Sequence, residues 1–172
     1  MSRSDIRHGD LPEQTQLPAP CRMHLAESTE EGSNAAQLTT YGGTPMVQRA
    51  FISFDYDHDA RLKDLLIGQS KLPDSPFEVH DWSIKTASPT WQAEARRRIR
   101  ASGLVIVLCG KHTHTATGVG IELGITQDEN VSYFLLAGYS DGGNTKPTTA
   151  KSSDKLYKWT WDNLKDLVDG AR

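Results

Sequence analysis

Two patterns of apolar and polar positions alternate from residue 46 onward. Short apolar runs predict β-strands, and longer stretches with apolar residues three or four positions apart predict amphipathic helices. The predicted strands are residues 47–54, 77–80, 103–110 and 131–137. The predicted helices are residues 59–68, 91–101, 119–127 and a C-terminal segment capped by Thr160. Strands that alternate with helices in this way predict an α/β fold.

The strand pattern also predicts how the sheet is built. The run "GLVIVLCG" (103–110) is apolar throughout, as expected for a parallel strand that is buried on both faces. Right-handed crossovers then give an open parallel sheet of four or five strands, flavodoxin-like and three-layered, with helices on both faces. Ligands of such sheets bind beyond the carboxyl ends of the strands. The loops expected there are "DYDHD" (55–59) and "GKHTHTATG" (110–118).

The first 45 residues differ from the rest of the chain. They are rich in Pro, Ser, Thr, Glu and Gly, and their apolar residues are isolated and follow no period. Such a segment cannot bury enough apolar surface to offset the entropy lost on ordering, so we expect it to be disordered or loosely attached. Met46 stands immediately before the first predicted strand, which makes it an alternative translation start. The folded domain is therefore expected at residues 46–172.

Length and composition are those of one globular domain. The chain has 172 residues, of which 37% are hydrophobic and 24% are charged. Its net charge of −3 provides no positive field for nucleic acid or an anionic membrane. No apolar run approaches the roughly 20 residues of a membrane helix, and no secretory signal is evident. Two cysteines do not make a disulfide framework. We therefore expect a cytoplasmic protein without nucleic-acid or membrane partners.

Three aspartates, Asp55, Asp57 and Asp59, follow the first predicted strand. A calcium loop of the EF-hand type is excluded, because the glycine at its sixth position and the acidic residue at its twelfth are replaced by Ala60 and Leu66. An aspartyl nucleophile is disfavoured, since no matching lysine or hydroxyl motif follows. The favoured prediction is that Asp57 or Asp59 caps the next helix. Asp55, nearest the strand end, remains a candidate pocket residue.

Two further stretches have weak chemical signatures. Cys109, His112 and His114 look like a fragment of a metal site, but a closed zinc site needs four ligands and no second Cys/His pair is present in the domain. We therefore predict no metal site. The run "RRRIR" (96–100) lies on the polar face of a predicted helix, where a solvated face is more common than a phosphate-binding one.

Glu122 lies near the start of the helix that follows the third predicted strand, with Val119, Ile121 and Leu123 around it. A glutamate in the first turn complements the helix dipole. A carboxylate at this edge of the sheet is also a candidate functional group. From the residues alone, the helix-dipole interpretation is favoured.

Two blocks of sequence resemble a known family. "RAFISFDYD" (49–57) and "VLCGKHTHTATGVGIEL" (107–123) are similar to the TIR-like domains of the Thoeris anti-phage ThsB type, a branch of the Toll/interleukin-1-receptor fold. The spacing from Gly110 through Thr113 to Glu122 is that of the family, and the resemblance extends from Met46 to about Ala137. The chain departs from many relatives at Gly118, where they have a Trp, and the loop after the second strand is only loosely similar.

The resemblance implies a site that handles NAD. Catalytic members cleave the bond between nicotinamide and ribose, and some close the product into a cyclic ADP-ribose. Glu122 matches the family's catalytic glutamate. The substrate-binding residues that the resemblance implies are Phe51, Ser53 and Asp55 from the first strand, Asp81 and Trp82 from the second loop, and Thr113 and His114.

The resemblance also implies partners. NAD is expected as a substrate, with no cofactor and no metal. The product is expected to be an ADP-ribose-type signal in anti-phage defence, read by a downstream effector, and the protein is expected to act as a homo-oligomer.

Two alternatives remain. The chain can be a non-catalytic TIR-like or receiver-like module that works through contacts with its own kind. It can also be another enzyme acting on a nucleotide-sugar bond, such as a relative of the nucleoside deoxyribosyltransferases, which use a glutamate near a sugar as well.

Overall fold

Five parallel strands form one sheet in the order β2-β1-β3-β4-β5. The computed structural model describes residues 47–84 and 89–171. The strands are β1 (Gln48–Ser53), β2 (Phe77–Trp82), β3 (Leu104–Cys109), β4 (Ser132–Ala137) and β5 (Leu156–Lys158). The helices are α1 (Ala60–Gln69), α2 (Trp91–Ala101), α3 (Thr117–Asp128) and α4 (Trp161–Val168), and η1 (Thr113–Thr115) is a short 3-10 helix. The predictions for residues 1–45 and for Met46 as a start lie outside the described residues.

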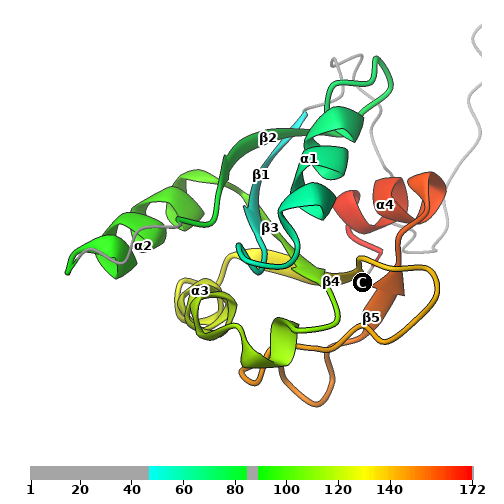
Figure 1. Ribbon diagram of the computed structural model, residues 1–172. Helices are drawn as coiled ribbons and strands as arrows, with labels where there is room; N and C mark the ends of the chain where they lie inside the picture. Colours follow the sequence, from blue (N-terminus) through cyan, green and yellow to red (C-terminus); the bar gives the residue numbers. More distant parts are fainter. Residues whose placement is uncertain (1–46, 85–88, 172) are drawn as a thin grey trace, which may run out of the picture. The chain divides into compact units, whose positions relative to one another are not determined.

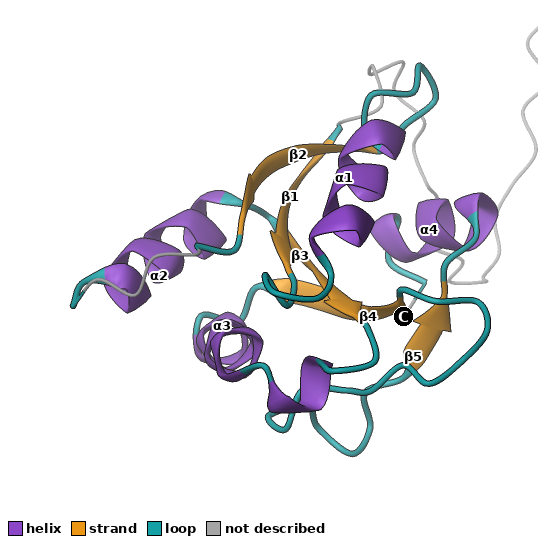
Figure 2. Cartoon of the chain, viewed as in Figure 1, coloured by secondary structure: helices purple, strands orange, loops and turns teal. Residues whose placement is uncertain are grey.

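The helices cover both faces of the sheet, as Figures 1 and 2 show. On one face, α1 and α4 pack on the β-strands through Leu62, Leu66, Leu164 and Leu167, against strand residues such as Ile106. On the other face lies a second buried cluster. It consists of Phe51, Ala95, Ile99, Val105, Val107, Cys109, Val119, Leu123, Ile125 and Leu135, from β1, β3, β4, α2 and α3. The three-layer, flavodoxin-like sheet is therefore confirmed.

The fifth strand, β5, has no counterpart among the predicted strands. It comprises only three residues, which pair with residues 135–137 of β4 and are at most half-buried. A strand this short at the edge of a sheet shows neither a continuous apolar run nor a clear alternation.

The carboxyl ends of β1 and β3 lie side by side, because Ser53 pairs with Val107 in parallel register. The loop after β1 and the loop after β3 therefore meet at one edge of the sheet. The long segment after β4 joins them, since the Thr145 N–H donates to the carbonyl oxygen of Gly110 over 2.8 Å. This edge is where the topology places a ligand.

The predicted side-chain cap at the start of α1 is wrong. Asp59 is the residue before the helix, but its side chain makes no cap hydrogen bond. Its carboxylate is instead buried, with 1% of the residue exposed, and accepts a hydrogen bond from the hydroxyl of Tyr139 over 3.2 Å. A Cβ atom at Gly110 would lie 2.2 Å from Asp59 Oδ1, so the contact requires glycine there. Burial raises the pKa of Asp59 above its ordinary value.

The cap predicted for the last helix is confirmed. The N–H of Asn163 donates to the hydroxyl of Thr160 over 3.3 Å. This bond satisfies one of the N–H groups that have no partner within the first turn of a helix.

The arginines of α2 are paired with carboxylates of the same domain. Arg96 and Arg100 both form ion pairs with Glu129, and Arg98 forms one with Asp81 over 2.7 Å. These partners come from β2 and from the end of α3, so the pairs fasten α2 to its neighbours.

None of the helices in the described ranges combines the length and the apolar character needed to cross a membrane.

We expect Leu164→Ala to lower the free energy of unfolding by about 2–5 kcal/mol, because Leu164 is fully buried where α4 meets the sheet. Leu65→Ala is the matched control: it is the same substitution on α1, but Leu65 is 55% exposed. Its effect should stay within about 0.5 kcal/mol. Urea unfolding followed by circular dichroism measures both. Equal losses in the two variants would contradict the packing of α4 described above.

Candidate functional site

A pocket of about 360 Å³ opens at the carboxyl edge of the sheet, between the loop after β1, the segment after β2 and the first half of α3. Its volume lies in the range of small-molecule sites. The residues that line it are Phe54, Asp55, Tyr56, Asp57, His58, Ser83, Ile84, Thr115, Ala116, Thr117, Gly118, Val119 and Glu122.

Glu122 lies at the buried end of this pocket, with 2% of the residue exposed. Its Oε2 atom accepts hydrogen bonds from the hydroxyls of Ser53 and Ser83, each over 2.6 Å. The backbone N–H of Ile84 also hydrogen-bonds to the carboxylate. A single side chain of α3 is therefore bonded to the end of β1 and to the segment after β2.

The two serines are themselves fixed by the sheet. Ser53 is the last residue of β1 and is fully buried. The hydroxyl of Ser83 accepts a hydrogen bond from the Phe54 N–H over 3.0 Å, and the Ser83 N–H donates to the carbonyl oxygen of Ile52 over 2.9 Å. Parallel pairing of β1 with β2 thus sets the position of both donors to Glu122.

Burial raises the pKa of Glu122 from its ordinary value of 4.5 to about 7, while the hydrogen bonds from Ser53, Ser83 and Ile84 act in the opposite direction. Desolvation penalises the ionised form, and three donors offset only part of that penalty. A carboxyl group with a pKa near neutrality is typical of functional sites.

Glu122 does not complement the dipole of α3. No acidic residue is present in the first turn of that helix, and Glu122 lies in the second turn with Val119 and Leu123 packed in the core beside it. The prediction of a first-turn charge is therefore wrong for this residue.

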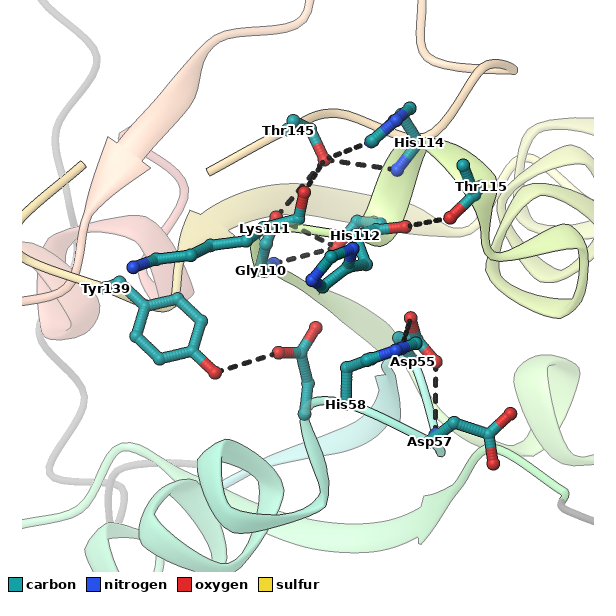
Figure 3. Close-up of polar contacts among 12 residues, drawn as sticks. Asp55, Asp57, His58, Gly110, Lys111, His112, His114, Thr115, Tyr139 and Thr145 are labelled. Carbon is teal, nitrogen blue, oxygen red and sulfur yellow. Dashed lines mark hydrogen bonds and ion pairs between the residues drawn. The ribbon is translucent and has the colours of Figure 1, made fainter. Parts of the chain in front are cut away.

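Asp55 and His58 form a second polar pair in the same pocket, shown in Figure 3. Nδ1 of His58 lies 2.8 Å from Oδ2 of Asp55, and the backbone N–H of Asp57 donates to Oδ1 of Asp55 over 3.1 Å. The imidazole ring of His58 also packs on that of His112, with 4.4 Å between ring centroids. The loop after β1 therefore presents an oriented histidine to the pocket.

The other residues predicted from the first strand lie behind the pocket wall. Ser53 does not line the pocket but hydrogen-bonds to Glu122, as described above. Phe51 is fully buried in the cluster that α2 and α3 cover, where it packs with Val105 and Leu123. Of the predicted residues, only Asp55 and Glu122 line the pocket itself.

Asp81 and Trp82 belong to β2 rather than to the loop after it. Asp81 forms an ion pair with Arg98 of α2. Trp82 is exposed, and the ammonium group of Lys63 lies 5.6 Å from the centroid of its ring. Neither side chain lines the pocket.

Thr113 and His114 lie in η1. The buried Thr113 hydroxyl accepts from the Gly110 N–H over 2.7 Å and closes the loop after β3. The exposed His114 contacts the Thr145 hydroxyl, 3.1 Å from both its backbone nitrogen and its Nδ1. Both residues shape the loop, and neither lines the pocket that holds Glu122.

Three residues of the site were not predicted: Ser83, Ile84 and His58. Ser83 and Ile84 follow β2 immediately, but only the register of β2 against β1 reveals that they reach Glu122. A signal did exist for His58, since it stands among the aspartates of the loop after β1. The spacing of those aspartates indicates a helix cap, however, and gives the histidine between them no separate signal.

Cys109, the third residue of the suggested metal fragment, is the last residue of β3 and is fully buried. Burial raises the pKa of its thiol to about 12. In the ranges 47–84 and 89–171, no three His, Cys, Asp or Glu side chains are arranged to hold a metal ion.

We expect Glu122→Gln to change how stability depends on pH. The native carboxyl holds its proton up to about pH 7 and the unfolded one only to about 4.5, so wild-type stability falls as pH rises between these values. A shift of this size corresponds to about 3 kcal/mol. The glutamine cannot ionise. The stability of Glu122→Gln relative to the wild type should therefore rise by up to that amount from pH 4.5 to 8, as measured by urea unfolding at each pH.

Glu129→Gln is the control for this measurement. Ion pairs with Arg100 and Arg96 hold the pKa of Glu129 below its ordinary value, so the carboxylate is ionised in both states above pH 5. The difference in free energy of unfolding between Glu129→Gln and the wild type should not vary between pH 5 and 8. A Glu122→Gln difference that is equally flat would show that Glu122 is not desolvated.

Comparison with known proteins agrees with the fold. The family model for the Thoeris protein ThsB, TIR-like domain, matches residues 51–137. The match covers half of the chain and runs from β1 through Glu122 to the end of β4. The chain matches none of the curated proteins. Because the family model spans the strands and the helix that build the pocket, this chain belongs to the family of Thoeris ThsB TIR-like domains.

Proposed function

We propose that the protein cleaves the bond between nicotinamide and ribose in NAD and releases an ADP-ribose-type product as a signal in anti-phage defence. The observation that carries this proposal is Glu122, a carboxylate that is buried at the end of a pocket and held on one oxygen by Ser53 and Ser83. Membership of the ThsB TIR-like family supports the proposal.

The chemistry of the bond suits a site with one buried carboxylate. Cleavage passes through an oxocarbenium-like ribose, as in glycoside hydrolysis. The leaving nicotinamide departs as a neutral molecule from a cationic precursor, so it needs no general acid. What the site must supply is a negative charge beside the ribose and exclusion of water. Glu122 meets both requirements.

The raised pKa of Glu122 is compatible with this role. In the protein alone, burial favours the neutral carboxyl group of Glu122. A bound pyridinium ring brings a positive charge next to it and favours the ionised form. Substrate binding therefore generates the charge that the transition state requires, and the hydroxyls of Ser53 and Ser83 fix its position.

The size of the pocket limits how much of NAD it encloses. At about 360 Å³ it is at the small end of ligand sites, so we expect the nicotinamide riboside half inside and the adenylate half beyond the rim. Assembly into homo-oligomers and a downstream effector that binds the product belong to the same proposal.

The first test is NAD turnover by the full chain, measured by chromatography of the products at high protein concentration with a crowding agent. Glu122→Gln should lower kcat by about 100- to 1,000-fold, because the charge beside the ribose is lost. The product peak then distinguishes ADP-ribose from a cyclic isomer. Glu129→Gln is the control, since Glu129 pairs with arginines outside the pocket. A wild-type protein that forms oligomers but leaves NAD intact would rule out this function.

The second prediction concerns Gly118, where many relatives have a Trp. Gly118 lines the pocket, and a Cβ atom there would meet no heavy atom within 4 Å. We expect Gly118→Trp to fold and to lower KM for NAD by about 2- to 10-fold, because an indole ring adds a stacking surface to the wall.

Gly124→Trp is the matched control for that variant. Gly124 lies on the same helix and also has free space around its Cα, but it does not line the pocket that holds Glu122. Its KM for NAD should equal that of the wild type. Equal KM values in both variants would mean that the wall at Gly118 does not contact the substrate.

A further inference from the structure

We propose that His58, oriented by Asp55, is the general base of the reaction: its Nε2 atom takes the proton from the water or hydroxyl group that attacks the ribose. This inference rests on the proposed function, because it assigns a residue to the second half of the same reaction. His58 is the catalytic residue in this scheme and Asp55 is the positioning residue.

The contacts of Asp55 orient the imidazole ring of His58. Its side chain is 9% exposed, and both of its oxygens have partners. Oδ1 accepts from the backbone N–H of Asp57, which leaves Oδ2 to face Nδ1 of His58 over 2.8 Å. Because a carboxylate accepts, Nδ1 is the ring nitrogen that carries the hydrogen. The lone pair of the neutral imidazole is then on Nε2.

The ring has a second support. His112, from the loop after β3, packs against His58 with 4.4 Å between centroids and 31° between planes. Figure 3 shows this packing, with the His58 side chain turned to Asp55. Two contacts from different loops therefore fix the orientation of one imidazole in the wall of the pocket that also contains Glu122.

The reaction releases a proton that needs an acceptor. The bond between C1′ and the pyridinium nitrogen breaks, and its electron pair goes to the nitrogen, which leaves as neutral nicotinamide. An oxygen lone pair of water or of a substrate hydroxyl forms the new bond to C1′. The proton of that oxygen moves to Nε2 of His58, and the resulting imidazolium is stabilised by Asp55 and then loses the proton to solvent. No oxidant or further reactant is required.

Glu122 and His58 differ in burial, and each degree of burial suits a different task in the reaction. Glu122 is sealed from water and accepts two hydroxyl donors on one oxygen, which suits a fixed charge beside the ribose. The His58 side chain is 50% exposed, which suits a group that must exchange a proton with solvent in every turnover. The same pocket thus holds a buried carboxylate and a solvent-exposed base.

The test compares NAD turnover by the full-length wild type, His58→Gln, His58→Ala and Asp55→Asn. His58→Gln should lower kcat by about 100- to 10,000-fold with little change in KM, because the glutamine keeps polar contact with Asp55 but accepts no proton. Imidazole added to the buffer should restore part of the activity of His58→Ala and none of that of Glu122→Gln. Asp55→Asn should lower kcat as well, because an amide that donates to Nδ1 leaves the hydrogen on Nε2.

The pH profile separates the base from a structural residue. The ionisable groups around His58 are Asp55, Asp57 and Asp59 in its own loop, His112 in the loop after β3 and Glu122 on α3. In the wild type, kcat/KM should fall at low pH, because Glu122 becomes neutral and because a protonated base has no lone pair left to accept the proton. In His58→Gln, the slope of log kcat/KM against pH in this acidic limb should decrease by one, because one group fewer must be deprotonated. His80→Gln is the control, since His80 is an exposed histidine of β2 that contacts Arg49.

The outcomes distinguish the two proposals. Activity of His58→Gln within about threefold of the wild type, together with an inactive Glu122→Gln, overturns the role of His58 and leaves the proposed function in place. A large loss in His58→Ala that imidazole does not restore, with an unchanged pH limb in His58→Gln, also overturns it. A wild type that does not turn over NAD overturns both.

Discussion

The buried carboxylate of Glu122 is the constraint on which the pocket depends. Taking an ionisable carboxyl group out of water costs several kcal/mol unless hydrogen bonds replace the lost hydration. Here the replacement comes from the hydroxyls of Ser53 and Ser83, on two different segments of the chain. The end of β1, the residues after β2 and the second turn of α3 must therefore keep their relative positions, and these segments form the inner wall of the pocket.

This arrangement is unfavourable for the fold alone. An apolar residue at position 122 would pack beside Val119 and Leu123 without any desolvation cost, and the replacement of buried ionic groups by apolar ones is often neutral or stabilising. Position 122 nevertheless holds a carboxyl group, and burial raises its pKa to about 7. Residues that break a local rule in this way cluster at functional sites. The energetic cost of Glu122 is thus an argument for its role that is independent of family resemblance.

The sequence predicts β1 to β4 because the pattern that defines each of these four strands is local. The apolar run of β3 and the periodicity of α2 identify those elements without any knowledge of their partners. The site is less predictable, because it depends on register. Ser83 reaches Glu122 only through the pairing of β1 with β2, and Asp59 is buried only because Gly110, far along the chain, has no side chain to exclude it. No pattern within a single segment contains either fact.

Asp55 and Asp59 show how little spacing alone decides. They stand four residues apart in one loop, and both are the kind of residue that caps a helix. In the structure they have different partners: Asp55 faces His58 of its own loop at the pocket, and Asp59 is buried against Tyr139 from the segment after β4. An aspartate that caps a helix accepts hydrogen bonds from the N–H groups of the first helical turn. Asp59 makes no side-chain cap bond, and Asp55 accepts a local N–H on Oδ1 alone, which leaves its Oδ2 to face His58. The loop after β1 therefore provides a carboxylate oxygen that orients an imidazole at the edge of the sheet where a parallel α/β fold binds its ligand.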